Sequence, residues 1–345
     1  MSKVVLGFSG GVDSAVAAEL LRQQGHQVLG LYLDNAGSEE REAAVTAAQQ
    51  RGIDLKVLDV HSRLEELVCR PFRECYVQGR TPNPCIICNP LLKFKSLLDY
   101  ADEQGAELIA TGHYARAKDG AIYRGMPSND QSYMLCRLTR EQAARLCLPL
   151  GDYEKLQVRQ MARDMGLPAA EKADSMEICF VPDKDYAAWL KERGPLPPAG
   201  DFVFNGEVVG KHEGIHRYTV GQRRPGLIDG RKVYISRIEP ETDRIYLSLW
   251  EDLFKTNVLA ESFNWLIDPP QGEIRAKVRV RHTKWEEPEC TAKILGELVS
   301  ISCASPVRAP APGQSAVLYQ DQRLIGGGFI VPEQGHFAGI DSSFA

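Results

Sequence analysis

Six residues near the start of the chain have the types and spacing of a phosphate cradle. The segment Ser9–Ser14, with the sequence SGGVDS, follows an apolar run, Lys3–Phe8, that predicts a buried strand. The alanine-rich residues after it predict a helix, which we expect Asp13 or Ser14 to cap. The two glycines let the backbone approach an oxyanion, and the start of a helix offers free N–H groups. The Gly-Lys-Ser/Thr ending of a Walker A loop is missing.

Cysteines form a second group of residues whose side chains could carry out chemistry. Cys85 and Cys88 have C-x₂-C spacing inside Thr81–Pro90, a proline-rich segment that predicts a stiff loop rather than a helix or a strand. Such a pair fits half a zinc site, a redox pair or part of an iron–sulfur site, and the lack of a second C-x₂-C or an H-x₃-H weakens zinc. Cys179 is a third candidate. The other cysteines are expected to be small buried hydrophobic residues, in helix-like segments at Cys69, Cys75, Cys136 and Cys147 and in β segments at Cys290 and Cys303.

Strands and helices alternate through the first part of the chain. These elements must position the Ser9–Ser14 cradle and the candidate cysteines. After the first strand and helix, strands are predicted at 26–33, 55–60 and 107–111, with helices at 38–50, 63–76 and 92–104. This pattern predicts a doubly wound parallel sheet with helices on both faces, an α/β fold. Ligands of such sheets bind beyond the carboxyl ends of the strands, where Ser9–Ser14, Leu33 and Thr111-Gly112-His113 fall. His113 fits either a catalytic role or a hydrogen-bonded structural one.

A proline- and glycine-rich stretch at Gly194–Gly200 marks a change of pattern. Short strands and turns follow it, with hairpin signals at Asn205-Gly206 and Asp229-Gly230. Strands at 274–280, 290–295, 298–302, 315–319 and 324–330 can close as a small barrel. We therefore predict an α/β domain at 1–194, a small α+β central domain at 195–255, a β-barrel at 256–332 and a loose tail at 333–345.

The composition is that of an ordinary globular protein, with 43% hydrophobic and 25% charged residues. No run of about 18 apolar residues predicts a membrane span, and no signal peptide precedes the first strand. We therefore expect a cytoplasmic protein without a membrane partner. The uneven spacing of an odd number of cysteines fits a reducing compartment. The net charge of −5 argues mildly against nucleic-acid binding, but the even spacing of Lys277, Arg279 and Arg281 predicts a local basic strand face.

The loop and the cysteines together resemble the tRNA-specific 2-thiouridylase family of the ATP pyrophosphatase (PP-loop) superfamily. The similarity runs through nearly the whole chain. Besides Ser9–Ser14, it is carried by GRTPNP at 79–84, Cys88-Asn89, KFK at 93–95, ATGHYAR at 110–116, DQSY at 130–133, GLP at 166–168, Asp174-Ser175, ICF at 178–180, YTVGQR at 218–223, APGQ at 311–314 and GGG at 326–328. The resemblance implies an ATP-binding first domain of the adenine-nucleotide hydrolase type and a C-terminal barrel that helps to hold the anticodon arm of tRNA.

The implied reaction replaces O2 of the wobble uridine with sulfur. ATP with Mg²⁺ adenylates O2, and sulfur then attacks C2 of the base and releases AMP. The resemblance implies ATP contacts at Gly7, Phe8, Ser9, Gly10, Gly11, Val12, Asp13, Ser14, Leu33 and Gly112, with Asp13 as the candidate on the Mg²⁺ side. It implies contacts with the target base at Asn83, Pro84 and Cys85, and with other parts of tRNA at Asn129, Asp130, Gln131, Arg279 and Val280.

The cysteines match the residues that handle sulfur in this family. Cys88 matches the nucleophile, and Cys179 matches the residue that carries a persulfide received from a sulfur-relay protein. Cys85 stands where family members usually carry Asp, so three cysteines are available to hold a 4Fe–4S cluster. Its open iron would take hydrosulfide from inorganic sulfide; otherwise Cys85 replaces Asp and the persulfide chemistry is unchanged. Pro225 and the short segment Met126–Ser128 are further departures, in segments expected to face tRNA.

Two other classes of function remain open on the sequence. One is an ATP pyrophosphatase that adenylates a small molecule for amide formation, although no glutaminase segment is evident and the loop cysteines would be unexplained. The other is a non-catalytic RNA-binding module that holds a metal, against which the phosphate cradle argues. Pyrophosphate release that depends on RNA would separate the three classes.

Overall fold

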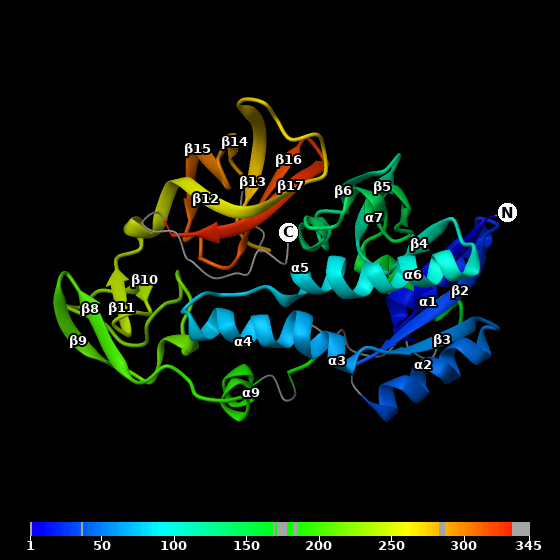
Figure 1. Cartoon of the computed structure of the whole chain (residues 1–345), viewed down its shortest axis with the longest axis horizontal. Helices are drawn as coiled ribbons and strands as arrows, with labels where there is room; N and C mark the ends of the chain where they lie inside the picture. Colours follow the sequence, from blue (N-terminus) through cyan, green and yellow to red (C-terminus); the bar gives the residue numbers. More distant parts are fainter. Residues whose placement is uncertain are drawn as a thin grey trace. The chain divides into compact units, whose positions relative to one another are not determined.

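The computed structural model of the chain describes residues 2–35, 37–167, 170, 178–181, 185–282 and 287–332. The chain divides into two compact units (Figure 1). The first comprises Met1–Cys69, Cys85–Phe180 and Gln322–Leu324, and the second comprises Arg70–Pro84, Val181–Asp321 and Ile325–Ala345. The finer division at 194 and 255 stays a prediction, and the tail at 333–345 lies outside the described residues.

The first unit is built on a parallel sheet. Its strand order is β3-β2-β1-β4-β7, and all neighbouring strands are parallel. The strands are β1 (Lys3–Gly7), β2 (Gln27–Asp34), β3 (Asp54–Asp59), β4 (Leu108–Ala110) and β7 (Leu146–Cys147). Val4, Val5 and Leu6 of the central β1 are fully buried, as expected for a strand that is covered on both faces. The predicted doubly wound α/β fold is confirmed.

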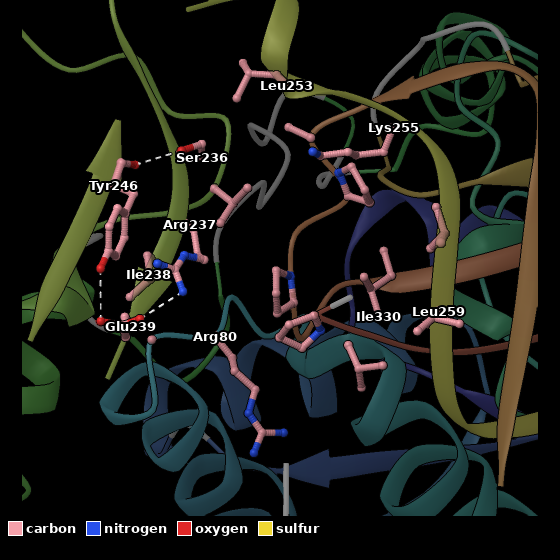
Figure 2. Close-up of a pocket in the computed structure, with 18 of the residues that line it drawn as sticks. Arg80, Ser236, Arg237, Ile238, Glu239, Tyr246, Leu253, Lys255, Leu259 and Ile330 are labelled. Carbon is pink, nitrogen blue, oxygen red and sulfur yellow. Dashed lines mark hydrogen bonds and ion pairs between the residues drawn. The ribbon is translucent and has the colours of Figure 1, made fainter. Parts of the chain in front are cut away.

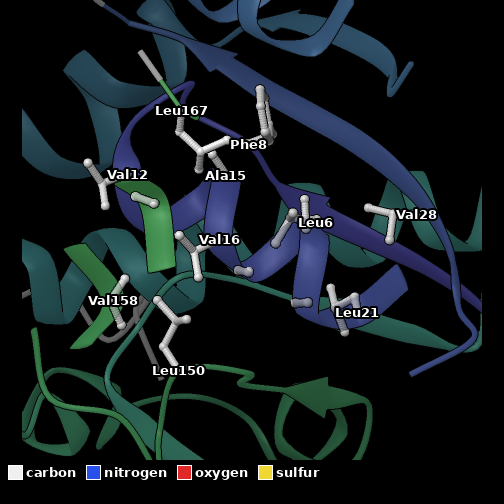
Figure 3. Close-up of a cluster of buried hydrophobic side chains, with 14 of the residues drawn as sticks. Leu6, Phe8, Val12, Ala15, Val16, Leu21, Val28, Leu150, Val158 and Leu167 are labelled. Atoms are coloured by element: carbon white, nitrogen blue, oxygen red, sulfur yellow. The ribbon is translucent and has the colours of Figure 1, made fainter. Parts of the chain in front are cut away.

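Helices pack on this sheet through their apolar faces. The longer ones are α1 (Val12–Gln23), α2 (Ser38–Gln50), α6 (Lys95–Gln104) and α8 (Lys155–Asp164). Figure 3 shows α1 beside β1, where Leu6, Phe8, Val16 and Val158 belong to one buried cluster. Packing of this kind, more than helix propensity, stabilises helices in folded proteins. The shorter elements are α3 (His61–Leu64), η1 (Glu65–Cys69), α5 (Pro84–Cys88), η2 (Asn89–Phe94), β5 (Ala115–Lys118), β6 (Ala121–Arg124), η3 (Ser132–Leu135) and α7 (Arg140–Ala144).

Two proline-containing segments fold as helices. The stiff loop predicted at Thr81–Pro90 is wrong from Pro84 onward, because Pro84 begins α5, where its missing N–H is not needed. Pro90 lies in η2, which is π-helical. Pro71 follows the π-helical η1 at the start of α4 (Arg70–Val77). A proline removes one i→i−4 hydrogen bond, and both segments depart from α geometry beside their proline.

The second unit contains a small mixed sheet with the order β10-β11-β8-β9. Asn205 and Gly206 join β8 to β9 with φ angles of 51° and 84°, so this hairpin signal is confirmed. α4 packs on α9 (Tyr186–Glu192) through Phe72 and Trp189, whose ring centroids are 5.7 Å apart. The elements of this part are β8 (Gly200–Phe204), β9 (Glu207–His212), η6 (Ile215–Arg217), β10 (Tyr234–Glu239), β11 (Arg244–Ser248) and η7 (Glu251–Leu253).

The C-terminal strands form a barrel with the order β12-β15-β14-β13-β16-β17, which β12 closes by pairing with β17. The predicted barrel is therefore confirmed. Its inward-facing residues include Val278, Ile301 and Leu318, each at most 1% exposed. The strands are β12 (Phe254–Trp265), β13 (Ile274–Arg279), β14 (Glu289–Leu295), β15 (Leu298–Arg308), β16 (Ser315–Gln320) and β17 (Arg323–Val331).

The cysteines outside the candidate site are mostly placed as predicted. Cys290 and Cys303 lie opposite each other on β14 and β15, and both are buried in the barrel. Cys147 was expected in a helix but belongs to β7, because its short segment pairs with β4. Within the described ranges, none of the helices has both the length and the apolar character needed to cross a membrane.

Replacing Leu318 by Ala should destabilise the second unit by about 2–5 kcal/mol, because a fully buried side chain would leave a cavity in the barrel. The same change at Leu295, which is 51% exposed, should alter the free energy of unfolding by less than about 0.5 kcal/mol. Urea unfolding followed by tryptophan fluorescence measures both variants. Equal unfolding midpoints would contradict this description of the barrel core.

Candidate active site

The cradle segment Ser9–Ser14 lies at the carboxyl edge of the parallel sheet. β1 has β2 on one side and β4 on the other, so the direction of the strand order changes at β1. Crevices at such switch points are where open α/β sheets bind ligands. The turn after β4 reaches the same place, because a Cβ added to Gly112 would lie 2.9 Å from the Cβ of Asp13. The structure thus brings together two segments that the sequence assigns to ATP.

A small hydrogen-bond network shapes the cradle. The backbone N–H of Ser9 donates to Oγ of Ser14 at 3.2 Å, and that hydroxyl donates to the carbonyl of Gly11 at 3.1 Å. The N–H of Gly11 donates in turn to Oγ of Ser9 at 3.4 Å. Gly10 has a φ of 74°, and a Cβ there would lie 2.9 Å from the Cα of Ala44. A larger residue at position 10 would therefore be strained in both backbone and packing.

The start of α1 has no side-chain cap. Its N-cap is Gly11, and no side-chain hydrogen bond closes the first turn. The prediction that Asp13 or Ser14 caps the helix is wrong, because the Ser14 hydroxyl bonds within the loop and the Asp13 carboxylate has other partners. An uncapped helix start retains its capacity to bind an anion.

The Asp13 carboxylate is held by an ammonium group and a phenol. Nζ of Lys155 lies 2.8 Å from Oδ1 and 2.7 Å from Oδ2, and the Tyr114 hydroxyl donates to Oδ1 at 2.7 Å. Lys155, which begins α8, was not predicted, because it is distant from Asp13 in the chain. Asp13 was the candidate on the Mg²⁺ side. Since Lys155 already neutralises this carboxylate, a metal ion bound there would have to displace it, and the arrangement does not fit a magnesium site centred on Asp13.

The three candidate cysteines lie in one neighbourhood of the first unit. Cys85 and Cys88 are three residues apart in α5, so they share a helix face. Burial raises the pKa of the Cys88 thiol to about 11; Lys93 opposes this rise, and Cys179 and Cys85 add to it. Desolvation, together with Cys85, also raises the pKa of Cys179. Cys85 and Cys179 therefore lie close enough to Cys88 to add to the rise of its pKa.

Asn35 contacts one of these thiols. Its side-chain amide donates to Sγ of Cys179 at 3.6 Å. Asn35 was not predicted as a site residue, although it directly follows β2 and so lies at the ligand-binding edge of the sheet. The contact joins the carboxyl edge of the sheet to the segment that carries Cys179.

His113 is a structural neighbour of the site. One of its ring nitrogens, Nδ1, is 2.7 Å from the hydroxyl of Thr111, and its ring lies 5.8 Å from that of Phe94. Burial holds the pKa of His113 well below its usual range, and Lys93 lowers it further. A neutral, packed imidazole favours the structural role over the catalytic one.

The thiols do not form a site for a single metal ion. Among the residues that the structure describes, no group of three or more His, Cys, Asp or Glu side chains is arranged to hold one. Cys85, Cys88 and Cys179 therefore do not make a mononuclear zinc centre. A 4Fe–4S cluster at these cysteines stays a prediction.

The candidate tRNA segment after β6 is held in place by its own side chains. Asp130 is buried and accepts hydrogen bonds from the N–H groups of Gly125 and Ser132 at 2.9 and 3.0 Å. Gln131 accepts from the N–H of Tyr114 at 3.0 Å. Asn129 donates to the carbonyl of Tyr153 at 3.4 Å. These contacts order the segment, and its role in tRNA binding stays a prediction.

Arg279 and Val280 lie at the end of β13 in the second unit. The side chain of Arg279 is 10% exposed and donates to the carbonyls of Arg281 and His282 at 3.1 and 2.9 Å. The predicted basic strand face is wrong at Arg281, because β13 ends at Arg279. The Arg281 guanidinium instead donates to the carbonyl of Ala309 at 2.8 Å.

A cavity of about 770 Å³ lies in the second unit, beside β10, β11 and β12 (Figure 2). Within it, Arg237 pairs with Glu239 at 2.8 Å, and the Tyr246 hydroxyl donates to the same carboxylate at 3.2 Å. Arg80 and Lys255 add positive charge, and further acidic residues offset it. None of the candidate ATP, cysteine or tRNA residues lines this cavity, so it does not mark the predicted site.

Proteins named tRNA-specific 2-thiouridylase MnmA are similar to the chain over nearly their full length. The protein from Pelobacter propionicus is 39% identical over 346 residues, which is 95% of this chain and 97% of the relative. That from Trichlorobacter lovleyi is 37% identical, over 96% of this chain and 98% of the relative. That from Carboxydothermus hydrogenoformans is 39% identical, over 95% and 97%.

Three domain families match successive parts of the chain. They are described as tRNA methyl transferase HUP domain at residues 2–183, tRNA methyl transferase PRC-barrel domain at 190–249 and aminomethyltransferase beta-barrel domain at 255–330. Among solved structures, a 4-thiouridine synthetase–RNA complex with bound ATP aligns with a TM-score of 0.38 and 17% identity over 56% of this chain and 50% of that chain. A likeness at that level carries no functional argument.

The ion pair of Asp13 and Lys155 should couple the two residues energetically. Asp13→Asn and Lys155→Met should each lower the free energy of unfolding, and the double variant should lose about 1 kcal/mol less than the sum of the single losses. The same cycle at the exposed pair Lys95 and Asp99 should give a coupling of about 0.3–0.5 kcal/mol. Chemical denaturation of all variants measures both couplings. Purely additive losses at Asp13 and Lys155 would contradict the pairing.

Proposed function

The chain belongs to the tRNA-specific 2-thiouridylase family, and on this basis we propose that it uses ATP to replace O2 of the wobble uridine of tRNA with sulfur. Its relatives are matched over nearly their full length, so their main parts have counterparts here. The structural observation that carries the proposal is the presence of an uncapped phosphate cradle and three neighbouring cysteines in one unit.

The names of two domain families mention methyl transfer, which would be a different reaction. Two features of the site support thiolation instead. The SGGVDS cradle presents backbone N–H groups suited to the phosphates of ATP. Cys85, Cys88 and Cys179 provide sulfur chemistry that methyl transfer does not need.

In the first step ATP activates the base. The proposed ATP contacts are Gly7–Ser14, Leu33 and Gly112, with the phosphates on the start of α1. O2 of the uridine forms a bond to the α-phosphorus, the bond from that phosphorus to the bridging oxygen breaks, and pyrophosphate leaves while N3 loses its proton. The adenylated oxygen is now a good leaving group. We assign no step to Mg²⁺ at Asp13, because Lys155 occupies that carboxylate.

In the second step a sulfur anion attacks C2 of the activated base. A new C–S bond forms, the bond between C2 and oxygen breaks, and its electron pair leaves with AMP. In the persulfide version, the outer sulfur on Cys179 attacks. The Cys88 thiolate then attacks the inner sulfur, which frees 2-thiouridine and leaves a Cys88–Cys179 disulfide. A thiol reductant restores both cysteines.

A cluster is the alternative sulfur carrier. Cys85, Cys88 and Cys179 would hold a 4Fe–4S cluster, which supplies an open iron for hydrosulfide. The chain's own contribution is the same in both versions, because it places the sulfur at the ligand-binding edge of the sheet. In the structure, the side-chain amide of Asn35 donates to Sγ of Cys179 at this edge. Sulfur comes from a relay protein in the persulfide version and from inorganic sulfide in the cluster version.

tRNA is the partner of this reaction. We propose that Asn83, Pro84 and Cys85 meet the target base, which must leave the anticodon stack to be reached. Further contacts are proposed at Asn129–Gln131 and at Arg279 and Val280. The family assignment does not favour amide formation or a purely RNA-binding role. Pyrophosphate release should accordingly require both ATP and tRNA.

Ser9→Ala should reduce tRNA-dependent pyrophosphate release at least tenfold, because the Ser9 hydroxyl both orders the cradle and supplies a phosphate donor. Binding of tRNA should stay within about twofold, since tRNA affinity depends mainly on backbone contacts elsewhere. Ser62→Ala, at an exposed position of α3, is the matched control and should behave as wild type. Normal pyrophosphate release in Ser9→Ala would refute the assignment of this loop.

Cys85→Asp should decide between the two sulfur carriers. If the persulfide version operates, this variant should remain active without iron, because Asp is the family's usual residue at this position. If a cluster operates, the variant should lose iron, chromophore and 2-thiouridine formation together, while adenylation of tRNA continues. Anaerobic purification, iron and sulfide counts and nucleoside analysis give the answer. An active, iron-free variant would exclude the cluster.

A further inference from the structure

Lys93 is a half-buried lysine beside the cysteine site. Its ammonium group has neither a hydrogen bond nor an ion pair with any residue in the described ranges. Lys95, two residues further on, is exposed and pairs with Asp99. Among the described residues the charge of Lys93 is therefore left available to a ligand or a reaction.

The local backbone places Lys93 close to Cys88 along the helix. Cys88 is the N-cap of η2, and a π-helical turn bonds residue i to residue i+5. Lys93 therefore follows Cys88 by one wide turn. Its neighbours Leu92 and Phe94 are 2% and 0% exposed and fill the core, so the side chain between them takes a different direction.

The charge of Lys93 reaches the sulfurs that must become anions. It lowers the pKa of both Cys88 and Cys179, against the burial and the neighbouring cysteines that raise them. His113 cannot take this role, because it is neutral. Among the described charges that act on both sulfurs, Lys93 is the positive one.

We propose that Lys93 is the positioning residue of the sulfur-transfer step, whose ammonium group balances and orients the negative charge of the attacking sulfur. This inference rests on the proposed thiolation. As the C–S bond forms and the bond from C2 to oxygen breaks, one negative charge moves from sulfur to AMP. A fixed cation near the sulfur holds the anion in place before attack, whether it is a persulfide or a hydrosulfide. Lys93 has no part in the earlier adenylation.

The test separates the two steps in single-turnover assays with ATP labelled at the α-phosphate. Lys93→Met should lower the rate of 2-thiouridine formation about 100-fold, because the cation is lost. It should release pyrophosphate at the wild-type rate and leave the AMP label on tRNA. Lys93→Arg keeps a cation, so its rate of 2-thiouridine formation should be within about tenfold of the wild-type rate. Lys95→Met is the matched control and should equal wild type in both steps.

The outcomes of this test distinguish a wrong role for Lys93 from a wrong proposed function. Wild-type thiolation by Lys93→Met would overturn the inference, and so would loss of pyrophosphate release, which would place Lys93 in adenylation or in folding. Failure of Lys93→Arg to recover would also overturn it, because a role based on charge requires recovery. If the wild-type protein itself formed pyrophosphate but no 2-thiouridine, the proposed function would fail instead.

Discussion

The close approach of two backbone segments at Gly112 is the constraint on which the rest of the site depends. The turn after β4 comes so near the start of α1 that even one added carbon would collide with Asp13. This contact is possible because β1 and β4 are neighbours in a parallel sheet, and both end at the same edge. The cradle, the Asp13–Lys155 pair and Tyr114 are all assembled around that contact. The topology of the sheet thus brings the backbone segments of the site together, and the side chains are positioned by those segments.

Wide helical turns also accompany the two prolines that lie within helical segments. η1 and η2 each contain or precede a proline, and both are π-helical. In η2 the wide turn also changes which residues follow Cys88 on its helix face. The apolar Leu92 and Phe94 are buried in the core, whereas Lys93 is half-buried and lowers the pKa of Cys88. One local irregularity therefore serves folding and the electrostatics of the sulfur site together.

The sequence predicted the elements with strong apolar patterns and missed features that depend on contacts between distant residues. β1 and the barrel strands followed from alternation or apolar runs. β12 was missed, because its polar outward residues hide the pattern and its two halves pair with different strands. The helix at Pro84 was missed, because proline was treated as a breaker although it occupies a helix start. Lys155 and Asn35 were not predictable, since only the folded sheet brings them to Asp13 and Cys179.

The discontinuous course of the chain also has a consequence for its synthesis on the ribosome. α4 belongs to the second unit, but it is made long before α9, on which Phe72 and Tyr76 pack through Trp189 and Tyr186. At roughly 5–20 residues per second, these aromatic rings wait several seconds for their partners. During that interval the nascent chain presents an uncovered apolar helix face, of the kind that chaperones bind. Neither unit can be completed from one continuous stretch of newly made polypeptide.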